Sequence, residues 1–207
     1  MSVHRAYGGV SADDRRLERR ERLMDAAFDL LATGGSAALT VTGVCKQAGL
    51  TERYFYESFR DRNALAHAAF ERLAAAGAST IANAAADAPD EPYGRARAVV
   101  DALVTQMHAD NRLESIVTRI DDDALLLRTR TYMSRALAGA VEKHAGLFWN
   151  VSQRRPSDVH TASLLVVGGI AEIVTAWLKG ELVCSRVELV DRCANFFVVV
   201  GETLINA

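Results

Sequence analysis

The chain has 207 residues, of which 50% are hydrophobic, so it can bury a substantial core. Its net charge of −2 gives no sign of a nucleic-acid partner. Residues 1–65 carry ten Lys and Arg against nine Asp and Glu, so DNA binding would depend on where the charges lie. Three cysteines without a CxxC pair argue against a zinc site and favour a reducing cytoplasm. Residues 11–22 contain no signal-peptide core, and the longest apolar runs are far short of the roughly 20 residues that a membrane helix needs.

The pattern of the whole chain predicts an all-α protein. Only three prolines occur, and the long proline-free stretches are rich in Ala, Leu, Arg and Glu without a strand-like alternation. The expected helices cover approximately residues 13–32, 41–48, 52–59, 61–86, 93–109, 113–119, 122–149, 157–178 and 186–205. We expect two domains, over residues 1–60 and 61–207, linked by the long helix at about 61–86.

The first four helices have recognisable end signals. Gly34 and Gly35 stop the first helix, and Gly49 can take the left-handed conformation that ends the second. Thr40, Thr51 and Asp61 stand where N-caps are needed for the second, third and fourth helices. In the first helix, Leu17, Met24, Phe28 and Leu31 should form the buried face. The arginines at 15–22 are expected chiefly to pair with acidic neighbours on the same helix, with a phosphate contact from one or two as an alternative.

Residues 39–65, LTVTGVCKQAGLTERYFYESFRDRNAL, place two short helices around a turn at Ala48-Gly49-Leu50. Their apolar positions can pack against the first helix and leave the second helix of the pair protruding, which is the helix-turn-helix arrangement. A helical hairpin with a solvated polar face would have the same apolar pattern. The expected inward positions are Leu39, Val44, Cys45, Ala48, Leu50, Phe55, Phe59 and Leu65.

This segment resembles the DNA-binding domain of the TetR family of transcriptional regulators. The resemblance rests on Thr40, Ala48-Gly49, Tyr56 and Phe59, then Asp61-Arg62 and Leu65, and on an opening helix with RRERLMDAAFDLLATGG. It covers about residues 15–70, while the remainder matches only in its helix layout. Arg53 stands where many members have a small residue, and Arg62 stands where Lys is commoner. The resemblance implies a homodimeric repressor that binds double-stranded operator DNA and responds to a small organic effector.

Each type of DNA contact has a candidate residue. Thr40 and Thr51 lie at helix starts, which suit phosphate oxygens, and Tyr56 and Arg62 should reach the same backbone. Arg53 could bond guanine bidentately, and Tyr54 could contact a thymine methyl group or a phosphate. The expected DNA-binding residues are Thr40, Thr51, Glu52, Arg53, Tyr54, Tyr56 and Arg62.

Three local signals organise the rest of the chain. Asp87–Pro92 is a connector, with Pro92 at the first turn of the next helix. Asn111 with Glu114, and Ser185 with Glu188, fit capping boxes.

The last two helices are the most apolar, and the final one is apolar on most sides, which predicts a partner helix. An ordinary monomer core is the alternative. The resemblance implies that both helices form a four-helix interface with their twins. The expected dimer residues are Gly168, Gly169, Phe196, Phe197 and Val200.

A pocket for an apolar effector is expected in the middle of the helical body, where large and adaptable side chains gather. Such side chains at helical spacing are also common in ordinary cores. The candidates are Met107, His108, Tyr132, Met133, Phe148, Trp149 and Trp177.

An enzyme is the main rival class, but the five histidines show no HExxH spacing, and no GxSxG, P-loop or dinucleotide motif occurs. Asp121-Asp122-Asp123 point in different directions on a helix and more plausibly cap it than bind metal. We therefore expect no catalytic residue, metal or cofactor. A helical adaptor that binds only protein is the second alternative.

Overall fold

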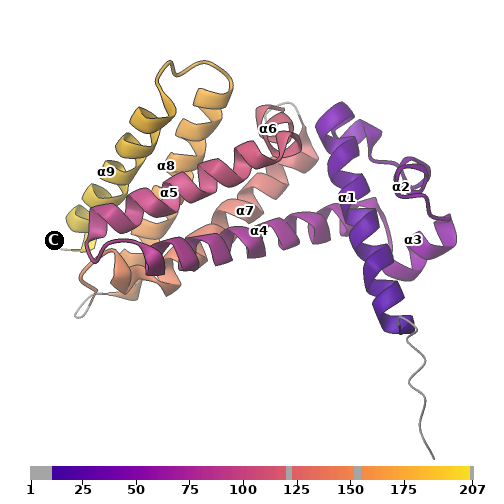
Figure 1. The fold of residues 1–207 in the computed structure, drawn as a ribbon, viewed down its shortest axis with the longest axis horizontal. Coiled ribbons are helices and arrows are strands. Elements are labelled where there is room, and N and C mark those ends of the chain that lie inside the picture. Colours follow the sequence, from indigo (N-terminus) through magenta and orange to yellow (C-terminus); the bar gives the residue numbers. More distant parts are fainter. Residues whose placement is uncertain (1–10, 120–122, 152–154, 206–207) are drawn as a thin grey trace, which may run out of the picture. The chain divides into compact units, whose positions relative to one another are not determined.

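The computed structural model describes residues 11–119, 123–151 and 155–205, and in these ranges it contains helices and no strand, as predicted. The chain divides into two compact units between Ala69 and Phe70, inside one continuous helix. The sequence had placed this division at residue 60, before that helix. The helices are α1 (Ala12–Ala38), α2 (Val41–Ala48), α3 (Glu52–Ser58), α4 (Arg62–Asp87), α5 (Pro92–Ala109), α6 (Asn111–Thr118), α7 (Ala124–Lys143), α8 (Pro156–Leu178) and α9 (Arg186–Ile205), with a 3-10 turn, η2, at Ala145–Leu147 (Figure 1).

The helix α1 begins with a reciprocal capping box between Ser11 and Asp14 and is interrupted near its C-terminal end. Gly35 has φ 62° and ψ −160°, which only glycine adopts readily, so Gly34-Gly35 breaks the helix near where the sequence predicted. The expected buried face is confirmed for its later part but wrong for Leu17, which is 58% exposed. Leu17 precedes the part of α1 whose residues are buried, which begins at Leu23.

The helices α2 and α3 follow the predicted boundaries to within one residue. The Thr40 side chain accepts the Gly43 N–H at 3.0 Å, and Gly49 ends α2 in the left-handed conformation at φ 63°. The Leu50 N–H then donates to the Cys45 carbonyl at 2.9 Å, which closes the turn between the two helices. The expected inward positions are buried except Leu50, which is half-buried.

Asp61 caps α4 as predicted, because its carboxylate accepts the Ala64 N–H at 2.8 Å. Pro92 begins α5 and the Ser185–Glu188 capping box precedes α9, as expected. The Asn111–Glu114 box is wrong. Asp110, one residue earlier, caps α6 by accepting the Arg112 N–H at 3.0 Å.

The expected helix over 122–149 is too long at its C-terminal end. Asp123 caps α7 through the N–H groups of Leu125 and Leu126, whereas Asp121 and Asp122 lie outside the described residues. The helix ends at Lys143 because His144 leaves the helical region, with φ −107° and ψ 15°. The 3-10 turn that follows carries Phe148 and Trp149 into the core.

The unit from Phe70 onward is a helical body in which α8 packs against α7 and α9, and α5 packs against α9. Figure 1 shows α8 and α9 as an antiparallel hairpin beside α5. The centre of its core is aromatic: the rings of Phe148 and Phe197 have centroids 4.8 Å apart, and those of Trp149 and Phe197 are 5.1 Å apart. Apolar burial of this kind supplies most of the stability of such a body.

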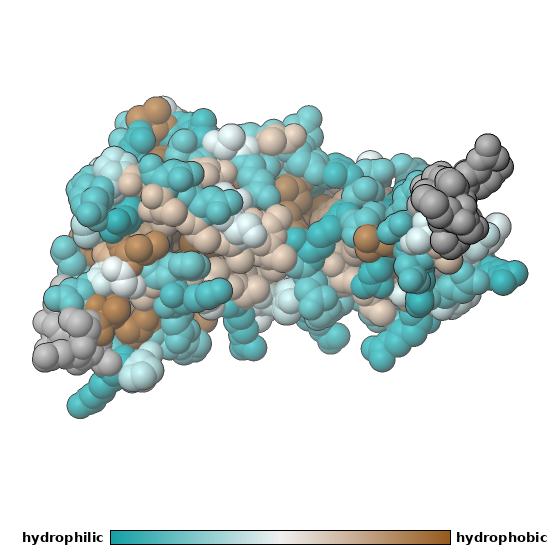
Figure 2. All heavy atoms as spheres, turned by 60° about the horizontal axis from the view of Figure 1, so that its bottom comes forward, coloured by the Kyte–Doolittle hydropathy of each residue, from teal (hydrophilic) through white to brown (hydrophobic). Residues whose placement is uncertain are grey.

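The helix α8 is long and apolar enough, by length and composition alone, to cross a membrane. The individual apolar runs within α8 are nevertheless short, as the sequence indicated, because Ser163 and Gly168-Gly169 interrupt them. In this fold α8 is packed between α7 and α9, yet only 28% of its most apolar window is buried. Part of its apolar surface therefore stays open within the protomer, and Figure 2 shows hydrophobic residues reaching the surface of the body on one face.

Candidate DNA-binding motif and internal cavity

Arginines of α1 hold α3 in place. Arg16 and Arg20 donate to the carbonyl oxygens of Glu57 and Ser58 at 3.2 and 3.1 Å, so they satisfy the C-terminal end of α3. The Arg20 guanidinium also lies over the Phe59 ring, 4.3 Å from its centroid. These arginines were expected chiefly to pair with acids of their own helix, and their contacts with α3 are a correction that sequence spacing along α1 could not indicate.

A second pair of arginines extends this arrangement. Arg22 donates to the Ala48 carbonyl at 2.5 Å, beside the left-handed Gly49, and Arg19 lies 4.5 Å from the centroid of the Tyr54 ring. The α1 side chains thus fix the ends of both α2 and α3. The recognition helix of the predicted motif is therefore supported from behind by side chains and not by apolar packing alone.

The helix α3 has one buried face and one exposed face, and Phe55 lies on the buried face. Its side chain is fully buried and packs edge-on against Tyr56, with the ring centroids 5.4 Å apart, and against Phe59 at 6.1 Å. Tyr56, in contrast, is 58% exposed and Tyr54 is 36% exposed. The helix therefore presents a polar and aromatic surface opposite its buried side, as a helix that enters the major groove does.

The charged side chains at the start of α3 are held by neighbours. The Arg53 Nε donates to Glu57 at 3.0 Å along the same helix face, and the Arg53 side chain is 83% exposed. Glu52 accepts a hydrogen bond from the Thr42 hydroxyl at 2.8 Å, which joins α2 to α3. This hydrogen bond uses Nε, and the two outer nitrogens of an exposed guanidinium form a fork suited to guanine O6 and N7.

Three further expected DNA-binding residues, Thr40, Thr51 and Arg62, differ in the hydrogen bonds that they make within the protein. Thr40 caps α2, whereas Thr51 stands at the N-cap of α3 without a side-chain cap hydrogen bond, so its expected capping role is wrong. Its exposed hydroxyl stays available to a ligand. Arg62 is exposed at the start of α4 and donates to the Leu39 carbonyl at 3.5 Å, a long and weak hydrogen bond that a phosphate can replace.

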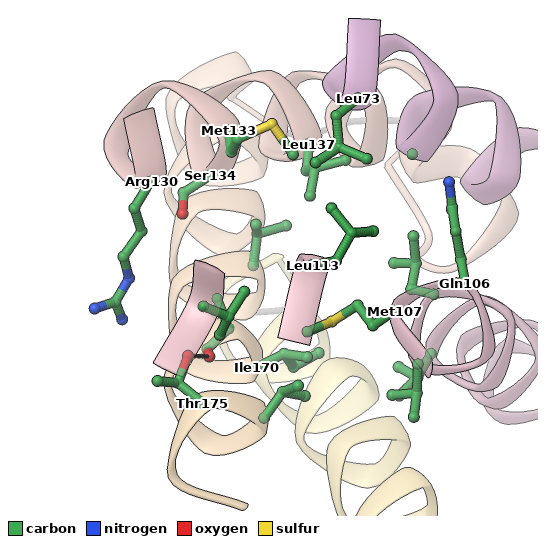
Figure 3. A pocket seen from close by; sticks show the side chains of 18 of the residues that line it. Leu73, Gln106, Met107, Leu113, Arg130, Met133, Ser134, Leu137, Ile170 and Thr175 are labelled. Carbon is green, nitrogen blue, oxygen red and sulfur yellow. Dashed lines mark hydrogen bonds between the residues drawn. The ribbon is translucent and has the colours of Figure 1, made fainter. Parts of the chain in front are cut away.

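The helical body contains a cavity of about 220 Å³ between α4, α5, α6, α7, α8 and α9 (Figure 3). Its walls are almost entirely apolar; Leu103, Met107, Leu113, Leu137 and Ile170 are representative. The polar side chains in the lining are those of Gln106, Arg130, Ser134 and Thr175. A concave apolar site with a few polar groups is the usual form of a small-molecule site.

Two of the seven expected pocket residues, Met107 and Met133, line this cavity. Phe148 and Trp149 instead belong to the core, where the Trp149 indole donates to the Phe197 carbonyl at 3.3 Å. Tyr132, His108 and Trp177 are also outside its lining; Trp177 donates to the Cys184 carbonyl at 2.9 Å and stacks edge-on with His108. The large aromatic residues did not indicate the position of the cavity, because their side chains are packed among other residues of the body.

The residues that sequence reasoning missed are aliphatic and lie one turn apart on the inner faces of the helices. Leu103 precedes Met107 by one turn on α5, and Arg130, Ser134 and Leu137 follow one face of α7. Gly77 allows α4 to approach α7, since a Cβ at Gly77 would lie 2.8 Å from Leu137. Helical spacing identifies such a stripe, but whether it meets another side chain or a cavity depends on the packing of several helices.

The expected dimer residues divide between the interior and the surface. Phe197 is only 1% exposed and lines the cavity, so it is not on the open face, a correction to the sequence expectation. Gly169 packs against Phe196 of the same protomer, because a Cβ at Gly169 would lie 2.9 Å from the Phe196 ring. Gly168 has open space around it, and Phe196 and Val200 are half-buried. The large exposed apolar side chains on the same two helices are Leu164, Leu165, Val187 and Val199.

Across residues 11–119, 123–151 and 155–205, no group of three or more His, Cys, Asp or Glu side chains is arranged to hold a metal ion. Cys45, Cys184 and Cys193 are all free thiols. Burial raises the pKa of Cys193 to about 11, so this thiol stays protonated and unreactive at neutral pH.

The geometry of α1 to α3 defines a helix-turn-helix protein with a separate helical body. Residues 23–69 match the sequence profile of the bacterial regulatory proteins of the tetR family. The HTH-type transcriptional regulator BetI of Stenotrophomonas maltophilia is 35% identical over 83 residues, which are 40% of this chain and 42% of BetI. The alignment thus spans less than half of that relative. The helix-turn-helix segment of this chain is thus similar to the tetR family of bacterial regulatory proteins, as its sequence predicted.

Solved structures of bacterial regulators share this fold at low sequence identity. The fatty acid degradation regulator FadR of Bacillus halodurans has a TM-score of 0.64 at 17% identity, over 87% of this chain and 94% of that one. FadR of Bacillus subtilis, in complex with stearoyl-CoA, has a TM-score of 0.63 at 18% identity, over 86% and 97%. SmeT, the repressor of the Stenotrophomonas maltophilia multidrug efflux pump SmeDEF, has 0.61 at 18%, over 89% and 88%.

Proposed function

We propose that this chain is a cytoplasmic, homodimeric transcriptional repressor that binds operator DNA through α3 and is released from it by a small apolar effector. The observation that carries the proposal is the division of α3 into a buried side, at Phe55, and an exposed side with Arg53, Tyr54 and Tyr56. An exposed face of arginine and tyrosine serves a phosphate backbone and base edges, and it has little use in an ordinary solvated helix. The family match over residues 23–69 covers this same motif.

Each expected DNA contact has a role within the proposal. The exposed hydroxyl of Thr51, the N-terminal end of α2 at Thr40, and the side chains of Tyr56 and Arg62 bind phosphates. Arg53 reads guanine, and Tyr54 contacts a neighbouring base or phosphate. Glu52, held by Thr42, can accept from a cytosine amino group.

Two recognition helices are needed to read successive major grooves about 34–36 Å apart, so the proposal includes a homodimer. The open apolar surface of α8 and α9, which includes Leu165, Gly168 and Val199, supports this interface. Burying the same surface twice in a symmetric contact removes it from water and stabilises the dimer.

The effector half of the proposal rests on the cavity of the body, with its apolar walls and few polar groups. A ligand releases DNA only to the extent that it binds the DNA-free state more tightly, typically by 1–3 kcal/mol of coupling. By the same linkage, operator DNA must weaken ligand binding by an equal factor. FadR of Bacillus subtilis, with stearoyl-CoA bound, and the repressor SmeT are proteins of this fold.

The test is the affinity of the purified chain for the DNA upstream of its own gene, measured by fluorescence anisotropy at moderate salt. We expect specific binding in the range of about 10⁻⁸ M or tighter, at least about a thousandfold tighter than binding to a shuffled sequence. The Arg53→Ala variant should lose much of this preference. A helical adaptor that binds only protein would show no difference between the two DNA sequences, and this result would refute the proposal. We propose no catalytic activity, because the family consists of transcriptional regulators.

A further inference from the structure

The arginines of α1 differ in what their guanidinium groups contact. Three of them donate to backbone carbonyl oxygens at the C-terminal ends of α2 and α3: Arg16, Arg20 and Arg22. Arg15 also has a partner within the protein. The guanidinium of Arg19 instead lies over the Tyr54 ring, 4.5 Å from its centroid, and within residues 11–119, 123–151 and 155–205 it makes no hydrogen bond or ion pair.

The nitrogens of Arg19 remain in contact with solvent although the residue is half-buried. In the described part of the chain, the buried side-chain nitrogens and oxygens that lack a partner belong to Ser58, Arg95 and Ser163, and not to Arg19. A cation over the face of a ring is held in place without the use of its N–H donors. Arg19 therefore has a fixed position and unused donors that an anion from solution can reach.

The helical geometry of α3 shows on which side of this helix the cation lies. Successive residues of an α-helix are about 100° apart, so Tyr54 and Tyr56 lie on opposite flanks of the fully buried Phe55. Arg53 lies about 160° from Phe55, and its side chain is 83% exposed. In a helix that enters the major groove, the outermost residues meet base edges and the two flanks meet the phosphate backbones on either side.

The two flanks of α3 differ in their neighbours. Tyr56 is 58% exposed, whereas Tyr54 is 36% exposed and carries the Arg19 guanidinium on its ring. A cation–π contact on the surface of a protein contributes little to stability, and Arg16 and Arg20 already join α1 to α3. The attachment of α3 to α1 therefore does not depend on Arg19, and a positive charge lies beside the flank that faces a phosphate backbone.

We propose that Arg19 is a phosphate-binding residue, so that α1 contacts the DNA backbone on the Tyr54 flank of α3, and that the Tyr54 ring holds its guanidinium in place. This inference rests on the proposed function, since it adds a second helix to the same DNA-binding surface. Guanidinium groups and phosphates match in geometry and form two parallel hydrogen bonds. A phosphate contact carries no sequence information, so Arg19 adds affinity for all DNA, whereas Arg53 distinguishes bases.

The first experiment measures the binding of the full chain to upstream and shuffled DNA by fluorescence anisotropy at several salt concentrations. Arg19→Gln should weaken binding to both sequences about fivefold at physiological salt and lower the slope of log affinity against log salt by about 0.9, because one phosphate contact is lost. Arg128→Gln is the matched control, because it makes the same change at an exposed position of α7 and should leave the slope unaltered.

The second experiment tests the role of the Tyr54 ring by double-mutant cycles. In the Tyr54→Phe background the ring is kept, so Arg19→Gln should again weaken binding about fivefold. In the Tyr54→Ala background the guanidinium is no longer held, so the additional loss from Arg19→Gln should fall to about twofold or less. The melting temperatures of the DNA-free variants identify any effect on folding, since a purely structural Arg19 would change the melting temperature and leave the salt slope as it is.

The outcomes separate this inference from the function on which it rests. An unchanged salt slope in Arg19→Gln, or a loss confined to the upstream sequence, would overturn the phosphate contact. An equal loss from Arg19→Gln in the Tyr54→Ala background would overturn the positioning by the ring. Equal affinity of the wild type for upstream and shuffled DNA would refute the proposed function instead, while a slope lowered by Arg19→Gln would still support the phosphate contact. If Arg19→Gln does not fold, Arg19→Lys decides the question: it keeps the charge without the planar group, so the slope should stay near that of the wild type while the dependence on Tyr54 is lost.

Discussion

The indole of Trp149 lies directly against Gly201 of α9, so closely that a Cβ at Gly201 would be only 1.9 Å from the indole nitrogen. Trp149 is 6% exposed and its nitrogen donates to the Phe197 carbonyl one turn earlier on α9. The absent side chain of one residue therefore provides the space for the largest side chain of the body's core.

The Gly201→Ala variant should be destabilised, because the added methyl group must displace the indole or separate η2 from α9. We expect a loss of about 1–3 kcal/mol in the free energy of unfolding, measured by urea denaturation followed by circular dichroism. Gly139→Ala is the control: no heavy atom lies within 4 Å of its Cβ position, so the change should stabilise α7 by about 0.5–1 kcal/mol. Equal effects of the two changes would show that the indole does not occupy this space.

Replacing Arg20 tests the support of α3 by α1. Arg20→Ala removes the hydrogen bond to the Ser58 carbonyl and the contact with the Phe59 ring, and should destabilise the N-terminal unit by about 1–2 kcal/mol. Arg20→Lys keeps the charge but not the planar group, so the stability of this variant should lie between that of the wild type and that of Arg20→Ala. The melting temperature without DNA is the readout. A lysine variant as weak as the alanine variant would show that geometry, and not charge, makes the contact.

The Asp61 carboxylate predicts a pH dependence of stability. The Ala64 N–H, followed by the nearby Arg60 charge, lowers the pKa of Asp61 in the folded protein. A carboxyl group whose folded pKa is lowered stabilises the protein above its ordinary pKa, about 3.9, and this contribution is lost as the pH falls through the folded value. Asp61→Asn should therefore melt below the wild type at pH 7, and the gap should close toward pH 3. A gap that stays constant with pH would contradict the assignment.

Arg62 predicts a change in the salt dependence of DNA binding. Arg62→Ala should weaken binding to operator and unrelated DNA alike and lower the slope of log affinity against log salt by about 1, because one phosphate contact is lost. Anisotropy titrations at several salt concentrations measure the slope. Arg128→Ala, at an exposed position of the body, serves as the control and should leave it unchanged. An unaltered slope for Arg62→Ala would remove this residue from the phosphate contacts.

The open face of α8 and α9 predicts a dimer at micromolar concentration, with a sedimentation mass near twice the 22.4 kDa of the chain. Leu165→Glu places a charge on a side chain that is 50% exposed in the protomer and should produce monomers. Leu127→Glu, at a similarly exposed leucine of α7, should remain dimeric. If the wild-type chain sedimented as a monomer, the proposal that a dimer binds a symmetric operator would be ruled out.

The sequence by itself determined the helical class, the helix-turn-helix and most of the helix ends, because these depend on neighbours in the chain. Thr40, Gly49, Asp61 and the Ser185–Glu188 pair act within a few residues, so their patterns predicted the observed caps and turns. The same reasoning went wrong at Asn111, where Asp110 made the cap instead.

Only the tertiary structure decided where the space in the body lies. Phe148, Trp149 and Phe197 look from sequence like ligand or dimer contacts, but a 3-10 turn and Gly201 bring them together as core. Arg130 carried no signal in the sequence, since its place beside the cavity depends on how α7 and α8 pack. Local caps are fixed by hydrogen bonds between near neighbours, whereas a cavity is the volume left by side chains from six helices, and no single segment specifies it.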